Sequence, residues 1–188
     1  MRVLAIDFET ANGNSASACA IGYALMDNGE IIRSDEILIK PHPSVGYFNY
    51  GNVKIHGLTP DMVRFADDWP MVYWQIKDCF RDSVVVAHNA MFDIAVLRSI
   101  NELYHIRMPD FTYVDTVSIS RVIHPQLINH KLNTVCEYLG YELDHHHAGS
   151  DALGCIAIIL DAMEIYDTYE INELLDVMCM KQHHYINK

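Results

Sequence analysis

Two acidic residues, Asp7 and Glu9, end the apolar segment 3–9 and have the types and spacing that chemistry requires. Side chains alternate between the two faces of an extended strand, so both carboxylates project from one face, about 7 Å apart at ~3.3 Å per residue. Ile6 and Phe8 then point to the opposite face and can be buried. Two close carboxylates repel each other unless a cation compensates them, and oxygen ligands suit Mg²⁺ or Mn²⁺. Taken alone, the pair also fits a solvated strand end.

Two further acids stand where the sequence predicts helices to begin. Asp93 follows the apolar segment 84–87, and ligands gather where the strands of an open α/β sheet end. An acid in a first helical turn also stabilises the helix, so Asp93 has a structural interpretation as well. Asp151 follows the three consecutive histidines 145–147, which fit either a metal-binding loop or a solvated turn. Neither position decides the chemistry by itself.

The elements that must position these residues form one predicted α/β domain over 1–188, with a short tail at about 181–188. Strands are predicted at 3–9, 18–26, 30–40, 84–87 and 111–114, and Asn28-Gly29 is a hairpin turn between antiparallel strands. Helices are predicted at 60–66, 71–80, 91–104, 116–123, 132–139, 150–166 and 171–180. The segment 41–60, with its prolines and glycines, is predicted to be an ordered loop, and Thr59 and Asn89 are candidate helix caps. This order predicts a mixed five-stranded central sheet flanked by helices.

Composition narrows the class of protein. The 188 residues are 51% hydrophobic and 20% charged, the balance of a folded globular chain. The five cysteines form no Cys-x-x-Cys pair, which indicates reduced thiols and a cytoplasmic location. The longest apolar run, 152–160, is far shorter than the roughly 20 residues of a membrane span, so no membrane association is expected. A net charge of −12 argues against a broad basic face for duplex nucleic acid; if the substrate is a nucleic acid, its capture must be local.

Three motifs together resemble those of a known family. They are Asp-Phe-Glu-Thr at 7–10, His-Asn-Ala-Met-Phe-Asp at 88–93, and His146-x-Ala-x-x-Asp151-Ala. In this order they are similar to the exonuclease motifs of the DEDDh superfamily, which includes the proofreading epsilon subunit of bacterial DNA polymerase III. The segments 55–59, 114–116 and 130–134 extend the resemblance over nearly the whole chain. A related branch would carry tyrosine at position 147, where this chain has histidine.

The resemblance implies a ribonuclease H-like fold and a metal-dependent 3′-to-5′ exonuclease. By it, the metal-binding acids are Asp7, Glu9, Asp93 and Asp151, and the general base is His146. Two Mg²⁺ or Mn²⁺ ions would clamp the scissile phosphate, and nucleoside 5′-monophosphates would be released. A histidine with a pKa near 6.5 can accept the proton of the attacking water near neutral pH.

Substrate contacts are expected from residues next to the motifs. They are Thr10, Ala11, His56, Asn89 and Phe92. Phe48, Tyr50 and Phe92 are candidate stacking surfaces for bases, although ordinary packing explains an aromatic side chain equally well.

The expected substrate is a single-stranded 3′ end, of DNA in the first place, with RNA trimming as the alternative within the same superfamily. A DNA polymerase acting in trans is an expected partner class. An inactive relative that serves as an interaction module is a third hypothesis, against which stands the presence of all four acids and the histidine.

Overall fold

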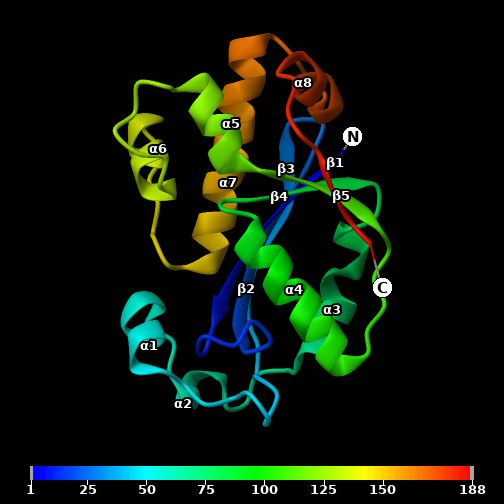
Figure 1. The fold of residues 1–188 in the computed structure, drawn as a ribbon, viewed down its shortest axis with the longest axis vertical. Helices are drawn as coiled ribbons and strands as arrows, with labels where there is room; N and C mark the ends of the chain where they lie inside the picture. The colour runs from blue at the N-terminus through cyan, green and yellow to red at the C-terminus, as the bar shows by residue number, and fades with distance from the viewer. Residues whose placement is uncertain (1, 187–188) are drawn as a thin grey trace.

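A six-stranded mixed sheet forms the centre of the computed structural model, which describes residues 2–186 (Figure 1). The strands are β1 (Arg2–Thr10), β2 (Ala18–Asp27), β3 (Glu30–Leu38), β4 (Ser83–Ala87), β5 (Phe111–Asp115) and β6 (His183–Tyr185), in the order β3-β2-β1-β4-β5-β6. β1 lies between an antiparallel neighbour, β2, and a parallel neighbour, β4. The predicted mixed sheet is confirmed, with six strands where five were expected. The additional strand, β6, lies within the segment 181–188 that was expected to be a tail.

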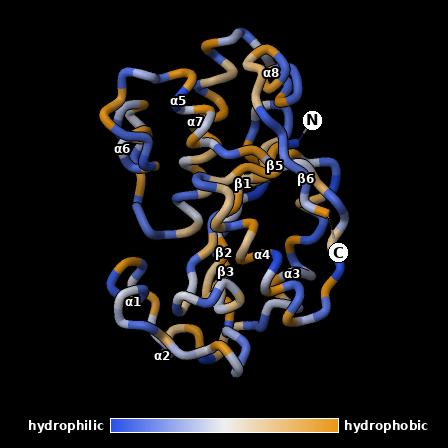
Figure 2. Tube along the Cα trace, in the orientation of Figure 1, coloured by the Kyte–Doolittle hydropathy of each residue, from blue (hydrophilic) through white to orange (hydrophobic). Residues whose placement is uncertain are grey.

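Helices cover both faces of the sheet. They are α1 (Tyr50–His56), α2 (Pro60–Val63), α3 (Trp69–Ile76), α4 (Met91–Tyr104), α5 (Thr116–Ile123), α6 (Leu132–Tyr138), α7 (Ala148–Tyr166) and α8 (Ile171–Val177), with a 3₁₀ turn at Lys77–Cys79. The helices α3 and α4 pack with one buried cluster that includes Ile6 and Phe8 of β1. The helices α5 to α8 pack with a second cluster that includes Val3 and Ala5 of the same strand. Figure 2 shows the hydrophobic residues concentrated along the central strands between these layers.

The alternation of β1 decides which way its acids face. Ile6 and Phe8 are buried on the α3/α4 side of the sheet, and Phe8 packs against Trp69 with ring centroids 5.7 Å apart. Side chains at odd positions therefore face α7, which is the side on which Asp7 and Glu9 emerge. Asp7 and Glu9 therefore share one face of the sheet, as the alternation of side chains along the strand predicted.

The hairpin between β2 and β3 forms where it was predicted. Asn28 and Gly29 both have positive φ angles, 49° and 81°, as the turn of a tight two-residue hairpin requires. The register that follows places Gly22 opposite Asp7 on one side and opposite Glu36 on the other. Three residues from β1, β2 and β3 thus form one row across the sheet.

Several local predictions are wrong. The segment 41–60 contains α1, whose first turn is capped by the Asn49 side chain accepting a hydrogen bond from Gly51 N (2.8 Å), while Gly57 at φ 75° ends the helix. Asn89 does not cap α4; Ala90 occupies that position, and Asn89 itself has a φ of 66°. The long helix α7 begins at Ala148, two residues before the predicted start.

Helix length and the state of the cysteines bear on the membrane and redox expectations. Between residues 2 and 186, no helix is both long and apolar enough to cross a lipid bilayer. The five cysteines are free thiols, and four of them are buried.

Candidate active site

The end of β1 projects past its parallel neighbour and leaves backbone donors to be satisfied. Pairing between β1 and β4 ends at Ala5 opposite Val86, so Phe8 N has no partner in that ladder. Asp93, in the first turn of α4 and 1% exposed, fills this place: its Oδ1 accepts a hydrogen bond from Phe8 N at 2.9 Å. This bond ties the start of α4 to the strand between its two acids.

The start of α7 brings another acid to the same place. Asp151 lies in the first turn of α7 and is 4% exposed. The helix approaches the sheet closely because Gly22 of β2 has no side chain; a Cβ there would overlap the carbonyl of Ala148. As a result, ligand oxygens of Asp7, Glu9 and Asp151 come within 4.8 Å of one another.

The loop before α7 folds around the carboxylate of Asp151. His145 Nδ1 lies 3.1 Å from one carboxylate oxygen, and the backbone N–H of His146 donates to the other at 3.1 Å. The rings of the two histidines stack with centroids 3.9 Å apart. His146 takes a φ of 72°, a left-handed conformation that costs a non-glycine residue free energy. Ring nitrogens of both histidines lie within 4.8 Å of Asp151, whereas His147 points elsewhere, 3.9 Å from Glu36 and 3.7 Å from Asp144.

The carboxylates repel one another strongly. Burial, followed by the charges of Asp93, Asp151 and Glu9, raises the pKa of Asp7 well above its usual value. Burial and the neighbouring acids raise the pKa of Glu9 to about 8. Burial raises the pKa of Asp93 to about 8 as well, against the opposing hydrogen bond from Phe8 N.

A divalent cation fits this arrangement. Close, partly buried carboxylates with raised pKa values gain stability from a bound cation, and their oxygen atoms are the ligands that Mg²⁺ and Mn²⁺ prefer. Asp7, Glu9 and Asp151 supply the nearest set of ligand atoms. Asp93 is adjacent, with one oxygen directed at Phe8 N and its charge acting on Asp7.

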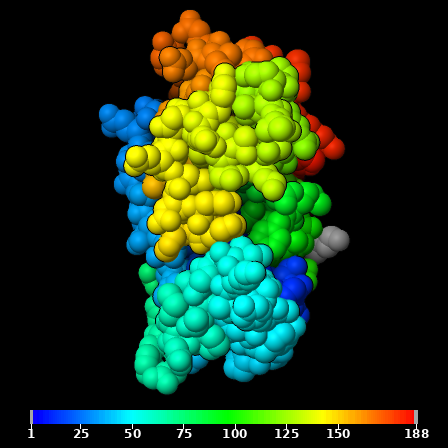
Figure 3. Space-filling model, turned by 90° about the vertical axis from the view of Figure 1, so that its left-hand side faces the viewer, coloured from blue at the N-terminus to red at the C-terminus, as the bar shows by residue number. Residues whose placement is uncertain are grey.

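A cleft of about 630 Å³ opens over these groups. It is lined by Asp7, Phe8, Glu9, His88, Asn89, Phe92, Val117, His130, Lys131, Leu132, Asn133, His145, His146 and Asp151. Phe92 is 44% exposed there, which leaves its ring free to stack. In Figure 3 the segment of α1 lies directly below the segment that contains α6 and the loop before α7, on the face that this view presents.

The other predicted substrate contacts, Thr10, Ala11 and His56, are not among the residues that line the cleft. Thr10 and Ala11 are buried, and Thr10 O accepts hydrogen bonds from Asn52 Nδ2 (2.9 Å) and His56 Nε2 (3.2 Å). His56 Nδ1 accepts from Leu58 N, just after α1, so Nε2 is the nitrogen that ties α1 to the end of β1; burial lowers the pKa of His56. These three residues thus shape the backbone beside the acids, and direct substrate contacts by their side chains stay a prediction.

Sequence reasoning missed two groups at this site. Glu36 of β3 accepts a hydrogen bond from Gly149 N at 3.1 Å, and its charge contributes to the raised pKa values of Asp7 and Glu9. An exposed edge strand with alternating polar residues gives no signal of such a contact. The segment 130–133 lines the cleft, and its quoted resemblance to the family was the only available signal.

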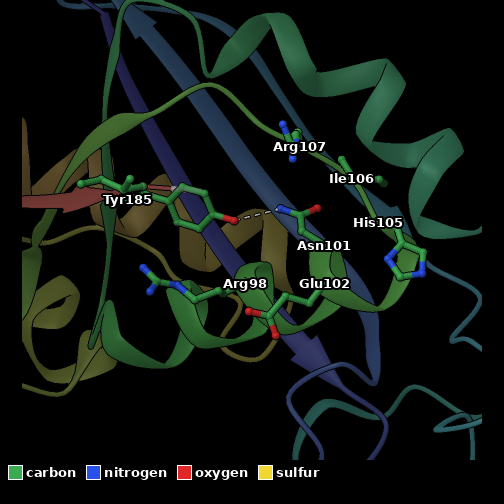
Figure 4. A pocket seen from close by; sticks show the side chains of 8 residues that line it. Arg98, Asn101, Glu102, His105, Ile106, Arg107 and Tyr185 are labelled. Carbon is green, nitrogen blue, oxygen red and sulfur yellow. Dashed lines mark hydrogen bonds between the residues drawn. The ribbon is translucent and has the colours of Figure 1, made fainter. Parts of the chain in front are cut away.

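A second cavity, of about 340 Å³, lies at the opposite end of α4 (Figure 4). The close-up shows the Tyr185 hydroxyl directed at Asn101, whose Nδ2 donates to it at 3.3 Å. Arg98 and Arg107 line this cavity, together with a single acid, Glu102. It therefore lacks the convergent carboxylates that distinguish the cleft.

Comparison with known proteins identifies relatives in sequence. The family model described as "RNase_T: Exonuclease" matches residues 4–159. The chain is 33% identical over 159 residues to the PolC-type DNA polymerase III of Listeria welshimeri, which covers 81% of this chain and 11% of the relative. The PolC-type enzyme of Bacillus subtilis is 32% identical over 120 residues, 63% of this chain and 8% of the relative. The chain thus spans a small part of the length of these relatives.

Solved structures with low sequence identity share the fold. Exonuclease X, in complex with 5′ overhanging duplex DNA, superposes with a TM-score of 0.72 at 22% identity, over 94% of this chain and 99% of that one. The nuclease domain of 3′hExo, a DEDDh family member bound to rAMP, superposes with a TM-score of 0.72 at 16% identity, over 87% and 92% of the two chains.

Proposed function

Because this chain belongs to the exonuclease family, as a 3′-to-5′ exonuclease of the DEDDh type, we propose that it removes nucleoside 5′-monophosphates from single-stranded 3′ ends of DNA. The observation that carries the proposal is the convergence of Asp7, Glu9 and Asp151 within 4.8 Å, beside Asp93, in an open cleft. Polymerase III relatives favour DNA over RNA as the substrate. They also favour a DNA polymerase as the partner, and the free thiols fit a cytoplasmic location.

Two divalent ions are the proposed cofactors, held by Asp7, Glu9, Asp93 and Asp151. When bound, such ions clamp the scissile phosphate and supply a hydroxide near neutral pH. The carboxylates that would hold them come from three elements of regular structure, β1, α4 and α7, which would pre-position the ligands.

His146 is the proposed general base. Its ring lines the cleft beside Asp151, and its imidazole is held by stacking on His145. Burial and the neighbouring His145 lower the pKa of His146, so the ring is neutral and able to accept a proton at pH 7. Asn89 and Phe92, which line the same cleft, are the proposed contacts to the terminal nucleotide, with a base stacked on the Phe92 ring.

The test is digestion of matched substrates by the purified chain. Single-stranded DNA, duplex DNA with a recessed 3′ end, and RNA of one sequence are labelled at the 5′ end and incubated with Mg²⁺, Mn²⁺ or excess chelator. We expect a ladder of stepwise shortened single-stranded DNA with either metal and none with chelator. Release of the 5′ label in the first products would contradict the polarity, and equal or faster digestion of RNA would replace DNA by RNA as the substrate.

A further inference from the structure

One wall of the cleft differs in charge from the rest. His130, Lys131, Leu132 and Asn133, here called the 130–133 wall, lie between α5 and α6 and at the start of α6. Lys131 is the one lysine or arginine among the residues that line the cleft in the described chain. Across residues 2–186, no carboxylate lies within ion-pair distance of its ammonium group, whereas acids dominate the opposite side of the cleft.

The wall is held rigidly by hydrogen bonds from the sheet side. His88, which follows β4, has its Nε2 2.8 Å from the carbonyl oxygen of His130 and its Nδ1 2.9 Å from Thr116 Oγ1. The His130 ring is fixed in turn by Ser120, with Nδ1 3.1 Å from the hydroxyl oxygen. These bonds set the backbone that presents Lys131.

The exposed side chains of the 130–133 wall make no hydrogen bonds within the described chain. Leu132 is buried and anchors the wall, whereas Lys131 and Asn133 are exposed on it. Among the hydrogen bonds of residues 2–186, none uses Lys131 Nζ or the Asn133 amide group. The wall thus combines a fixed backbone with two unused donor groups that face the cleft.

A single strand that enters this cleft brings more than one negative charge. The divalent ions that the acids would hold would compensate the scissile phosphate, but the next phosphodiester along the strand would still carry its own charge. The net charge of −12 repels it, and phosphates are held chiefly by lysine and arginine. Within the cleft, Lys131 is the cation that can do so.

We propose that Lys131, with Asn133 beside it, binds the phosphodiester on the 5′ side of the scissile phosphate. The cleft then holds two consecutive phosphates by different means: one at the acids and one at the 130–133 wall. This inference rests on the proposed function, because it assigns a second subsite to the same substrate. It makes the site selective for a strand over a mononucleotide ester.

Two substrates separate the subsite from the chemistry. A single-stranded DNA oligonucleotide has a second phosphate, whereas thymidine 5′-(p-nitrophenyl phosphate) has only the phosphodiester that is cleaved. For Lys131→Ala we expect KM on the oligonucleotide to rise about tenfold, the effect of losing one charge-assisted hydrogen bond. The kcat/KM on the oligonucleotide should therefore fall about tenfold more than the kcat/KM on the ester.

Salt dependence gives an independent readout. Removing one phosphate contact should lower the slope of log KM against log salt concentration by about 0.7 for a single strand. Lys131→Arg should restore most of the oligonucleotide affinity. Lys77→Ala is the matched control, because Lys77 lies in the 3₁₀ turn with its ammonium over the Trp74 ring, 3.2 Å from the centroid, and does not line the cleft.

The outcomes distinguish this inference from the proposed function. Equal losses on both substrates, or an unchanged KM and salt slope, would overturn the subsite while leaving the exonuclease assignment intact. A wild-type protein that cleaves neither substrate with Mg²⁺ or Mn²⁺ would overturn the proposed function, and the subsite with it. Thermal unfolding of each variant shows whether its fold is intact.

Discussion

The two ends of α4 bury polar groups equally well but treat them in opposite ways. At the first turn, Asp93 is 1% exposed, and its burial, followed by the nearby charges of Asp115 and Asp151, raises its pKa to about 8. Near the last turn, Asn101 is 2% exposed and both ends of its amide are hydrogen-bonded: its Oδ1 accepts from Trp69 Nε1 at 2.7 Å and its Nδ2 donates to Tyr185.

The difference separates function from stability. The amide network at Asn101 is complete within the protein, so it fixes the packing of α3, α4 and β6. The carboxylates near Asp93 are incomplete within the protein, because burial and mutual repulsion keep their pKa values high unless a cation binds them. Burial alone does not single out a candidate site; burial of clustered groups with strongly shifted pKa values does.

The strongest test of this contrast is Asp7→Asn. The substitution removes one ligand charge from the centre of the carboxylate group, so we expect cleavage to fall by more than the ~10⁴-fold that a general base contributes at most. The fold should remain intact, since the repulsion is reduced. The digestion assay with 5′-labelled DNA measures the loss, and Asp27→Asn, at the end of β2 and outside the cleft, is the control for the change in charge. Substantial Mn²⁺-dependent activity in Asp7→Asn would contradict the ligand assignment.

His146→Ala is expected to have the next largest effect, lowering kcat by about 10²- to 10⁴-fold as the loss of a general base does. His147→Ala is the control, because its side chain is 62% exposed and turned toward Glu36 and Asp144. Burial first and His145 second lower the pKa of His146, so His145→Ala should move the acidic limb of the kcat profile to higher pH. If another of the three histidines proves the most sensitive, the register of the motif is wrong.

The charged end of α4 should also make stability depend on pH when metal is removed. The pKa values of Glu9 and Asp93 rise from 4.5 and 3.8 to about 8 in the folded chain, so the folded state retains protons that the unfolded chain releases. Stability from these groups is therefore complete at low pH and is lost as pH rises to about 8. With chelator, the Tm should fall by several degrees between pH 5 and pH 8, at ~2–4 °C per kcal/mol. Mg²⁺ should remove most of this slope; a flat profile in chelator would contradict the repulsion.

At the hydrogen-bonded end of α4, around Asn101, a substitution should lower stability and leave activity unchanged. Asn101→Leu leaves the buried indole N–H of Trp69 without its acceptor, which should lower the free energy of unfolding by about 1–3 kcal/mol. The kcat on single-stranded DNA should not change. Urea denaturation measures the stability, with Gln75→Ala, at an exposed position, expected to stay within about 0.5 kcal/mol of wild type. A loss of activity in a stably folded Asn101→Leu would break the contrast between the two ends.

The local sequence pattern was enough to predict most strands and helices and the positions of the acids on them. The period of two in β1 put Asp7 and Glu9 on one face, and the start of α4 put Asp93 in a first turn. The ribonuclease H-like fold and the membership of the DEDDh exonucleases, both expected from the three motifs, are confirmed. The placement of the acids on their elements depends on residues that are close in the sequence, whereas the fold and family follow from the three motifs taken together.

Most of what the sequence did not predict depends on contacts between distant segments, and α1 is the exception. The strand β6 has three residues and forms by pairing with β5, at positions 70 to 74 residues earlier in the chain. The helix α1 was missed because glycines and prolines around it indicated a loop, while its cap at Asn49 is a local side-chain contact. The position of Glu36 beside the start of α7 and that of Lys131 at the cleft follow from packing of β3 and α6 against the motif-bearing elements, which no local pattern contains.

The absence of a side chain at Gly22 affects residues far from it in the sequence. This residue binds nothing, yet one additional methyl group there would push α7, and with it Asp151, away from Asp7 and Glu9. A chain could therefore keep all four acids and the histidine and still fail to assemble them. The motifs alone are thus an incomplete criterion for an active relative. Glycine at the position of Gly22 in β2 must accompany them.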